Sequence, residues 1–376
     1  MGRTRNKKTK AITTLDVLAR QKEPPSSAAL LEKAQSLIVQ CDYELAKRFI
    51  ERALQADTTD STAREMLGVV QLELGDLDDA KQTFESLVPP SSTAPPTPPT
   101  SAFLYLAQLV AEDDPHSALR YYQTAVDILQ AQLKGKARAS DDDKNDETET
   151  KQTAVRALIS MVEIWMDPAQ DLCFDPVAEK TCEELLQKAL VTDPGNAEAT
   201  QMLASVRMSQ QRPDEAKQLL DQAWSVWKDF DVDDPRLPSL ETRLALVRLF
   251  LELALFAPAL LVLQGVMAVD DQEVEAWYLE GWCFFLMAEQ SKTSGEPIEG
   301  LTWEELAKDA YDCLQTCKTL HTNQDHPDRP LLEHAEELMH TLDGFGITPS
   351  PADEEDDEWE EADSDDVGSD DDIEMS

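Results

Sequence analysis

The sequence predicts an all-α protein, organised as about seven antiparallel helix pairs followed by one C-terminal capping helix. Two observations predict this class. Small and large apolar residues recur with a period of 34, and glycine is scarce, with 12 residues in 376 against a usual share of about 7%. So few glycines leave few positions for tight hairpins or phosphate-cradling loops, whereas the period fits a repeated two-helix unit.

The period is clearest in the first two repeats. The first carries Ala34, Ala46, Ile50 and Ala53, and the second carries Gly68, Ala80, Phe84 and Leu87, each 34 residues further on. Small residues at these offsets allow the two helices of one unit to approach closely, while larger apolar side chains fill the space between units. This spacing resembles the tetratricopeptide repeat, which implies a right-handed superhelical solenoid.

Five further repeats keep the register after insertions. Their marker residues are, in order, Ala118, Tyr122 and Ala125; Cys182, Leu186, Ala189 and Pro194; Ala204, Ala216, Leu220 and Ala223; Val247, Ala259, Leu263 and Val266; and Trp277, Gly281, Phe284, Ala310, Leu314 and Cys317. The amphipathic segment Leu331–Leu342 is predicted to cap the array. The third and fourth repeats lack a clear first helix, so we expect irregular packing there. The alternative is a generic helical bundle whose alanines align by coincidence.

Composition predicts three regions. Residues 1–26 form a basic arm, and residues 344–376 form a tail with 15 acids and no base after residue 350. Both are expected to be disordered. The solenoid is predicted at residues 27–343, with proline-rich, charged and polar loops at 89–101, 134–151 and 291–300. The basic arm is typical of a nuclear localisation signal or of a solvated tail.

Charge limits the class of partner. The chain has 75 acidic and 33 basic residues, a formal net charge of −42, and residues 23–350 alone carry −33. Because contacts to phosphate come from Lys and Arg, we expect no direct binding of nucleic acid. We expect the protein to be a monomer. Its high negative charge indicates that its partners are basic proteins.

Motifs for catalysis are missing from the sequence. It contains no G-x-x-x-x-G-K-[ST], G-x-G-x-x-G or H-E-x-x-H motif, so we expect no enzyme, no cofactor and no metal site. Cys313 and Cys317 are predicted to be a buried pair because no CxxC accompanies them. Reduced thiols indicate the cytoplasm or nucleus. The most apolar stretch, Ala245–Val269, contains Arg248 and Glu252, which argues against a membrane span.

The tetratricopeptide resemblance implies that positions 2, 5, 9, 12 and 13 of each first helix line a concave binding face. In this sequence those positions carry acids with interleaved aromatics, which suit a peptide rich in Lys and Arg. The candidate residues are Glu65, Glu73, Glu112, Glu198, Glu241, Glu252, Glu275, Tyr278, Trp282 and Phe285. Taken singly, each is also explained by a solvated surface or by packing against a neighbouring repeat.

One familiar use of this fold is disfavoured. Co-chaperones that bind the EEVD carboxylate of heat-shock chaperones need Lys, Asn and Arg at groove positions. Here those positions hold Leu31, Gln35, Glu65 and Val69. A carboxylate clamp is therefore not expected.

The pattern as a whole resembles a known family. A basic start, GRTRNKKTKAITTLDVLA, precedes the acidic array, and the acidic tail ends in DSDDVGSDDDIEMS. This pattern resembles the dedicated eukaryotic assembly chaperones of large-subunit ribosomal protein L-four. The resemblance implies that a newly made ribosomal protein is captured through its basic internal loop and kept soluble. It also implies escort from cytoplasm to nucleus, with an importin reached through the client, and release at the large-subunit pre-ribosome.

The residues alone leave two other interpretations open. An acidic tetratricopeptide histone chaperone would capture core histones instead. A non-catalytic scaffold would make salt-resistant contacts on apolar surface. An acidic groove that substitutes for RNA phosphate predicts fast, salt-sensitive binding.

Overall fold

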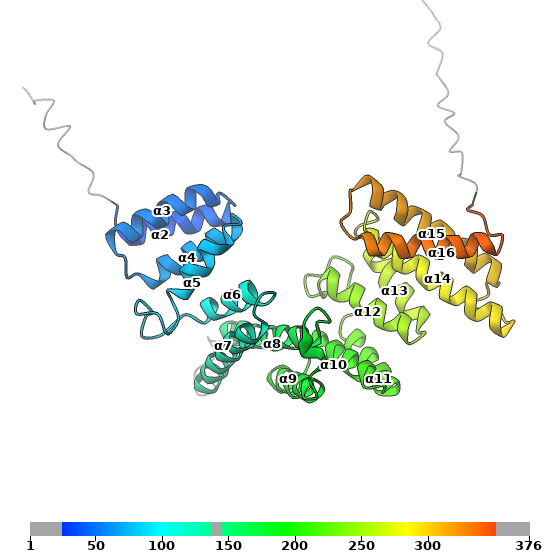
Figure 1. Cartoon of the computed structure of the whole chain (residues 1–376), viewed down its shortest axis with the longest axis horizontal. Coiled ribbons are helices and arrows are strands. Elements are labelled where there is room, and N and C mark those ends of the chain that lie inside the picture. The colour runs from blue at the N-terminus through cyan, green and yellow to red at the C-terminus, as the bar shows by residue number, and fades with distance from the viewer. Residues whose placement is uncertain (1–24, 137–143, 351–376) are drawn as a thin grey trace, which may run out of the picture. The chain divides into compact units, whose positions relative to one another are not determined.

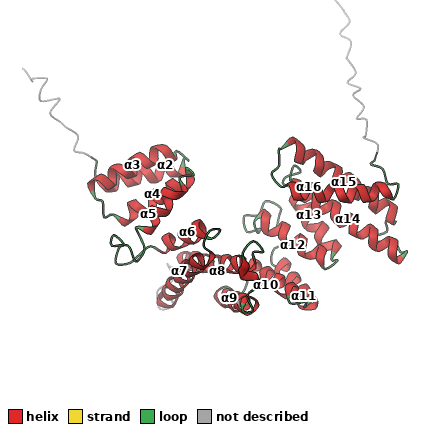
Figure 2. Ribbon diagram, viewed as in Figure 1, coloured by secondary structure: helices red, strands yellow, loops and turns green. Residues whose placement is uncertain are grey.

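The computed structural model describes residues 25–136 and 144–350, and in these ranges the protein is helical (Figures 1 and 2). This part of the chain contains fifteen α-helices and one short 3-10 helix, Asp171–Phe174. Its one isolated β-bridge joins Ile298 and Leu301. The chain divides into two compact units, which meet in sequence between Trp227 and Lys228. The all-α prediction is confirmed.

The first unit contains five helix pairs in chain order. They are α2 (Ser27–Val39) with α3 (Tyr43–Ala56), α4 (Ser61–Glu73) with α5 (Leu77–Glu85), α6 (Thr100–Val110) with α7 (Pro115–Lys136), α8 (Lys144–Met166) with α9 (Ala178–Thr192), and α10 (Ala197–Ser209) with α11 (Pro213–Ser225). The second helix of each of the first four pairs also packs on the first helix of the next pair. Neighbouring repeats therefore share one continuous set of contacts within this unit.

The second unit contains two further pairs and a final helix. The pairs are α12 (Leu240–Glu252) with α13 (Phe256–Met267) and α14 (Val274–Ser294) with α15 (Trp303–Asn323), and the final helix is α16 (Arg329–Gly344). Helix α16 packs against both α14 and α15. It includes the whole segment Leu331–Leu342, so the predicted capping helix is confirmed.

Side-chain caps start many of these helices. Asp42, Asp60, Asn196, Ser239 and Asp328 each stand before a helix and accept a hydrogen bond from a backbone N–H of its first turn. Thr302 and Glu305 form a reciprocal capping box at the start of α15. Because the first N–H groups of a helix have no partner within it, these caps define where each repeat begins.

The small residues of the 34-residue period lie where paired helices approach most closely. A Cβ atom at Gly68 would lie 2.6 Å from Cζ of Phe84 on the partner helix. At Gly281 it would lie 2.7 Å from Cγ of Leu314 and 3.2 Å from the carbonyl oxygen of Ala310. Phe84 and Leu314 are fully buried. The 34-residue period therefore marks the positions where a large side chain of one helix packs against a glycine of its partner helix.

The structure differs from the prediction in the third and fourth repeats. Both have regular first helices, α6 and α8. Most of the loop expected at 134–151 is helical, since α7 continues to Lys136 and α8 starts at Lys144. The first turn of α8 carries Asp146 and Glu147, favoured at a helix N-terminus, and Glu147 pairs with Lys151 one turn later at 2.6 Å. A helix stabilised by polar contacts has no apolar periodicity for the sequence to display.

The other loop predictions agree more closely with the helix bounds. Helix α6 starts at Thr100, just inside the proline-rich loop expected at 89–101. Helix α14 runs on to Ser294 and ends at Gly295, whose φ of 72° reverses the chain, so the loop expected at 291–300 is shorter than predicted. Of the arms predicted at 1–26 and 344–376, residues 1–24 and 351–376 lie outside the described residues. In the described part, Ser26 caps α2, α16 extends to Gly344, and residues 345–347 form a hydrogen-bonded turn, so order extends beyond the predicted bounds of 27–343. Among the helices described, none has the length and apolar character needed to cross a bilayer.

We predict that Gly281→Ala destabilises the second unit by about 1 to 3 kcal/mol, because the new methyl group overlaps Leu314 in a filled core. Gly265→Ala is the matched control, since it lies in α13 with no atom within 4 Å of the added Cβ. It should stabilise the unit by about 0.5 to 1 kcal/mol through helix propensity. Urea denaturation followed by circular dichroism measures both. Equal effects of the two substitutions would contradict the packing argument.

Candidate protein-binding surface

Two of the predicted acids lie close to a tyrosine on the next repeat. The Glu65 carboxylate, on α4, accepts a hydrogen bond from the Ser101 hydroxyl of α6. Burial raises the pKa of Tyr105, also on α6, and the charges of Glu65 and Glu73 raise it further. Both carboxylates therefore lie near the Tyr105 hydroxyl.

A second tyrosine, on the preceding repeat, borders one of these carboxylates, that of Glu73. Tyr43 is the first residue of α3. A hydrogen bond with Cys41, with smaller effects of desolvation and of the Glu73 charge, raises the pKa of Tyr43 to about 12. We call Glu65, Glu73, Tyr43 and Tyr105 the α4 patch. Glu73 is exposed and Glu65 is partly exposed, so the α4 patch presents negative charge beside aromatic rings.

The two other acids predicted in the first unit lie in different settings. Glu112 is exposed in the turn between α6 and α7, where its backbone carbonyl accepts a 3.3 Å hydrogen bond from Gln170. Glu198 is half-buried in the first turn of α10, and burial raises its pKa while the charge of Arg156 on α8 lowers it. Its charge is thus partly compensated within the protein.

In the second unit the predicted acids differ in whether an arginine already pairs with the carboxylate. Glu241 opens α12 and Glu252 ends it, and both are exposed. Glu275, in the first turn of α14, accepts a hydrogen bond from the guanidinium of Arg248 on α12. Glu241 and Glu252 therefore offer uncompensated charge, whereas the charge of Glu275 is already paired.

The three predicted aromatics take part in the packing of α14. The Tyr278 hydroxyl and Nδ1 of His334 on α16 are 2.7 Å apart. Tyr278 stacks on Trp282 with ring centroids 6.0 Å apart, and the His334 ring meets Trp282 edge-on at 5.7 Å. Burial raises the pKa of Tyr278 to about 12. Phe285 is only 7% exposed and belongs to the core. Tyr278 and Trp282 each keep a partly exposed face.

Groove positions of successive repeats meet one another. Position 2 of α6 is Ser101, which contacts Glu65 at position 5 of α4. Position 2 of α14 is Glu275, which contacts Arg248 at position 9 of α12. The predicted site residues did not include Arg248, although it occupies one of the five groove positions. Counting those positions along α12 would have identified it. The contact of His334 with Tyr278 has no such signal, because α16 lies outside the repeat.

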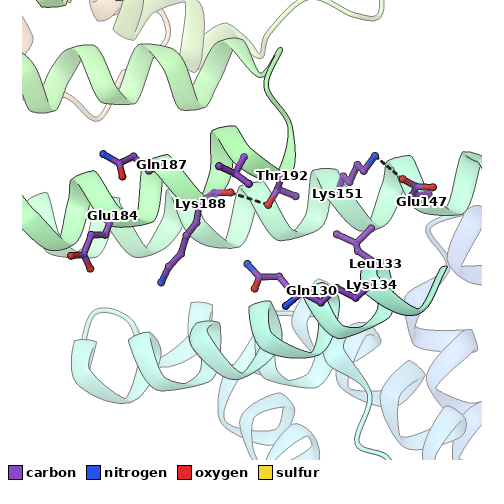
Figure 3. Close-up of a pocket in the computed structure, with 10 residues that line it drawn as sticks. Gln130, Leu133, Lys134, Glu147, Lys151, Glu184, Gln187, Lys188 and Thr192 are labelled. Atoms are coloured by element: carbon purple, nitrogen blue, oxygen red, sulfur yellow. Dashed lines mark hydrogen bonds and ion pairs between the residues drawn. The ribbon is translucent and has the colours of Figure 1, made fainter. Parts of the chain in front are cut away.

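A separate groove of about 760 Å³ lies between α7, α8 and α9 (Figure 3). Its lining consists of Gln130, Leu133, Lys134, Glu147, Lys151, Glu184, Gln187, Lys188, Val191 and Thr192. Three lysines outnumber two glutamates, and one of those glutamates already pairs with Lys151. This groove lacks the acidic excess that a basic peptide requires, unlike the α4 patch.

The described residues bring no group of three or more potential metal ligands together. Several thiols there are also poor nucleophiles, since burial raises the pKa of Cys182 to about 11 and of Cys283 and Cys317 to about 12. The thiolate is the reactive form.

Known proteins share this architecture. A family model for the tetratricopeptide repeat matches residues 37–91 and 183–226. A solved structure of an assembly chaperone of RpL4, Acl4, covering residues 1–338 of that protein, aligns with a TM-score of 0.64 at 26% identity over 72% of this chain and 100% of its own. A tetratricopeptide repeat protein from Parabacteroides merdae, at 14% identity and a TM-score of 0.50 over 84% of this chain and 98% of its own, shares the fold.

Two relatives match over most of their length. A probable assembly chaperone of rpl4 from Emericella nidulans is 28% identical, with 91% of this chain and 90% of the relative covered. A probable assembly chaperone of rpl4 from Schizosaccharomyces pombe is 31% identical over 339 residues, with 89% of this chain and 96% of the relative covered. This chain therefore belongs to the family of tetratricopeptide-repeat assembly chaperones of rpl4.

Proposed function

We propose that this protein is a dedicated, non-catalytic chaperone that binds newly made ribosomal protein L-four and keeps it soluble until it joins the large-subunit pre-ribosome. The observation that carries the proposal is the α4 patch, where Glu65 and Glu73 stand beside two tyrosines. Carboxylates next to aromatic faces complement Lys and Arg side chains through ion pairs and cation–π contacts. Family membership supplies the identity of the client.

In this proposal each unit offers its own acids to the client. Within the first unit Glu65 and Glu73 are the principal contacts, with Glu112 and Glu198 as weaker ones. Within the second unit Glu241 and Glu252 carry uncompensated charge, Glu275 is masked by Arg248, and Tyr278 and Trp282 offer aromatic faces. Phe285 contributes through packing only, because it is buried.

The mechanism follows from competition between polyanions. A ribosomal protein segment destined for RNA is basic, and the acidic surface substitutes for phosphate until RNA displaces it. The chaperone itself is repelled by RNA because its net charge is −42. In this proposal the protein acts as a monomer in cytoplasm and nucleus, without direct nucleic-acid contact, and an importin reaches the complex through the client.

We predict that Glu65→Gln with Glu73→Gln weakens binding of the basic client loop about three- to tenfold at low salt. Each exposed ion pair contributes about 0.2 to 1 kcal/mol, and glutamine still accepts the hydrogen bond from Ser101. Glu51→Gln with Glu85→Gln is the matched control, since both acids are exposed on second helices, Glu51 in the preceding repeat and Glu85 in the same repeat as Glu65 and Glu73. Calorimetric titration in low and raised salt measures the effect, which should shrink as salt screens the charges. Equal losses in both variants would assign the effect to net charge alone.

Removing a base should strengthen the same interaction. Arg248→Gln frees the Glu275 carboxylate and removes a cation from the surface, so we expect about two- to fivefold tighter binding of the client at low salt. Glu275→Gln should instead weaken binding by a similar factor, because it leaves the Arg248 guanidinium without its counter-charge and facing a basic client. The same titration compares the two variants. Weaker binding by Arg248→Gln would contradict a role for Glu275 in client contact.

Client identity is tested by capture during translation. We expect tagged protein to recover ribosomal protein L-four together with its messenger RNA, and raised salt to reduce the yield. Ribosome release by puromycin is the control, because it should abolish recovery of the message but not of the protein. Recovery of core histones would favour a histone chaperone, and a salt-resistant complex without either client would favour a scaffold.

A further inference from the structure

The chain reverses direction after α16 and continues as a short ordered segment. The backbone N–H of Gly346 donates to the carbonyl of Asp343 at 2.9 Å, and that of Ile347 donates to the carbonyl of Leu342 at 3.1 Å. Gly346 has a φ of +79°. This Schellman-type ending turns the chain back at the end of the helix. We call residues 345–350 the C-terminal strap.

The strap is held at both of its ends. At the first, the Lys292 ammonium lies 3.3 Å from the ring centroid of Phe345 and 4.4 Å from that of Trp303. At the second, the backbone N–H of Ser350 donates to Oδ1 of Asp312 at 2.8 Å, and the Ser350 hydroxyl donates to Oδ2 at 2.5 Å. Helix α15 thus holds the strap through one carboxylate at the point where residues 351–376 begin.

The surroundings of Ser350 are acidic. Asp312 lies on α15 with Asp309 and Glu305 on the preceding turns. Burial raises the pKa of Asp309, and the charges of Asp312 and Glu305 raise it further, while Lys308 opposes them. The negative charges of these three carboxylates are therefore close together on α15. Ser350 contacts this region by donating two hydrogen bonds. A negatively charged group in place of its hydroxyl proton would be repelled by the carboxylates.

The strap also carries a modification motif. Thr348 is followed by Pro349 and Ser350 by Pro351, and Thr348 and Ser350 are exposed. A hydroxyl residue directly before proline is the sequence that proline-directed protein kinases select. The residue before proline is biased toward extended backbone, the conformation in which a segment enters a kinase cleft. The motif and the carboxylate clamp meet at one residue, Ser350.

We propose that Ser350 is a phosphorylation site for a proline-directed kinase and that its phosphate releases the C-terminal strap from Asp312. In the reaction the Ser350 oxygen forms a bond to the γ-phosphorus of ATP, the bond from that phosphorus to the β-γ bridging oxygen breaks, and ADP leaves. The hydroxyl proton passes to the catalytic carboxylate of the kinase. Thr348 serves as the comparison site, because no hydrogen bond of its side chain holds the strap.

Two physical effects drive the release. The hydroxyl loses the proton that it donates to Asp312, and the phosphate adds about −1.5 to −2 charges beside a carboxylate. Like charges in such a pair repel. Release at Ser350 leaves the contact of Phe345 with Lys292 in place. It frees up to five residues, whose total extended reach is about 16 to 18 Å at about 3.3 to 3.6 Å per residue. Phosphorylation therefore controls where the acidic tail is attached to the helical array.

The experiment treats the full-length protein with a proline-directed kinase and ATP, locates phosphate by mass spectrometry, and follows hydrogen exchange of residues 345–350. We expect phosphate on Ser350 and exchange of its amide about tenfold faster, because two hydrogen bonds to a charged acceptor are lost. Thr348→Ala should leave this response intact, and Ser350→Ala should abolish it. Absence of phosphate at Ser350 would overturn the site.

A charge reversal tests the clamp itself. In Asp312→Arg the strap should be loose before treatment, and phosphorylation should slow exchange, because a guanidinium binds phosphate with charge-assisted hydrogen bonds. The opposite signs of the response in the native protein and in this variant are the expected result. Phosphate on Ser350 with unchanged exchange in the native protein, or with the same sign of change in both proteins, would overturn the release mechanism.

Discussion

The close approach of two helices within each repeat is the constraint on which the rest of this structure depends. Phe84 packs on Gly68 and Leu314 on Gly281 at distances that leave no room for a Cβ atom. Because each repeat then contacts its neighbours along the chain within its own unit, the faces of successive first helices in that unit come into register through local packing alone. A binding surface assembled in this way needs no long-range contact to position its residues.

The same register makes the groove positions serve two purposes. Ser101 binds Glu65 across one repeat boundary, and Arg248 binds Glu275 across another. These contacts fix the orientation of carboxylates that would otherwise rotate freely, so less side-chain entropy is lost when a ligand binds. They also place an arginine among acids, which offsets repulsion inside the surface. The strength of the acidic field is therefore set by which carboxylates remain unpaired, more than by how many there are.

The part of this protein that could be predicted from the sequence is the part governed by local periodicity. Repeats with their small residues at 34-residue spacing were located correctly, and so was the capping helix. The start of α8 could not be found, because polar pairs such as Glu147 with Lys151 stabilise it without apolar periodicity. Among the site residues, the register located the positions but not their contacts. Whether Tyr278 faces solvent or His334 depends on α16, which lies outside the repeat.

A net charge of −33 on residues 23–350 carries a cost for the protein on its own, because self-repulsion disfavours the compact state. A basic client relieves that repulsion and, by binding the folded form, stabilises it further. The proposed function thus couples the stability of the chaperone to occupancy. In the proposed function the acidic field would also set the route of release, since RNA would be repelled by the chaperone and attracted by the client. An incoming polyanion would then compete for the basic segment and not for the acidic surface, and the exchange would leave the chaperone as it was before capture.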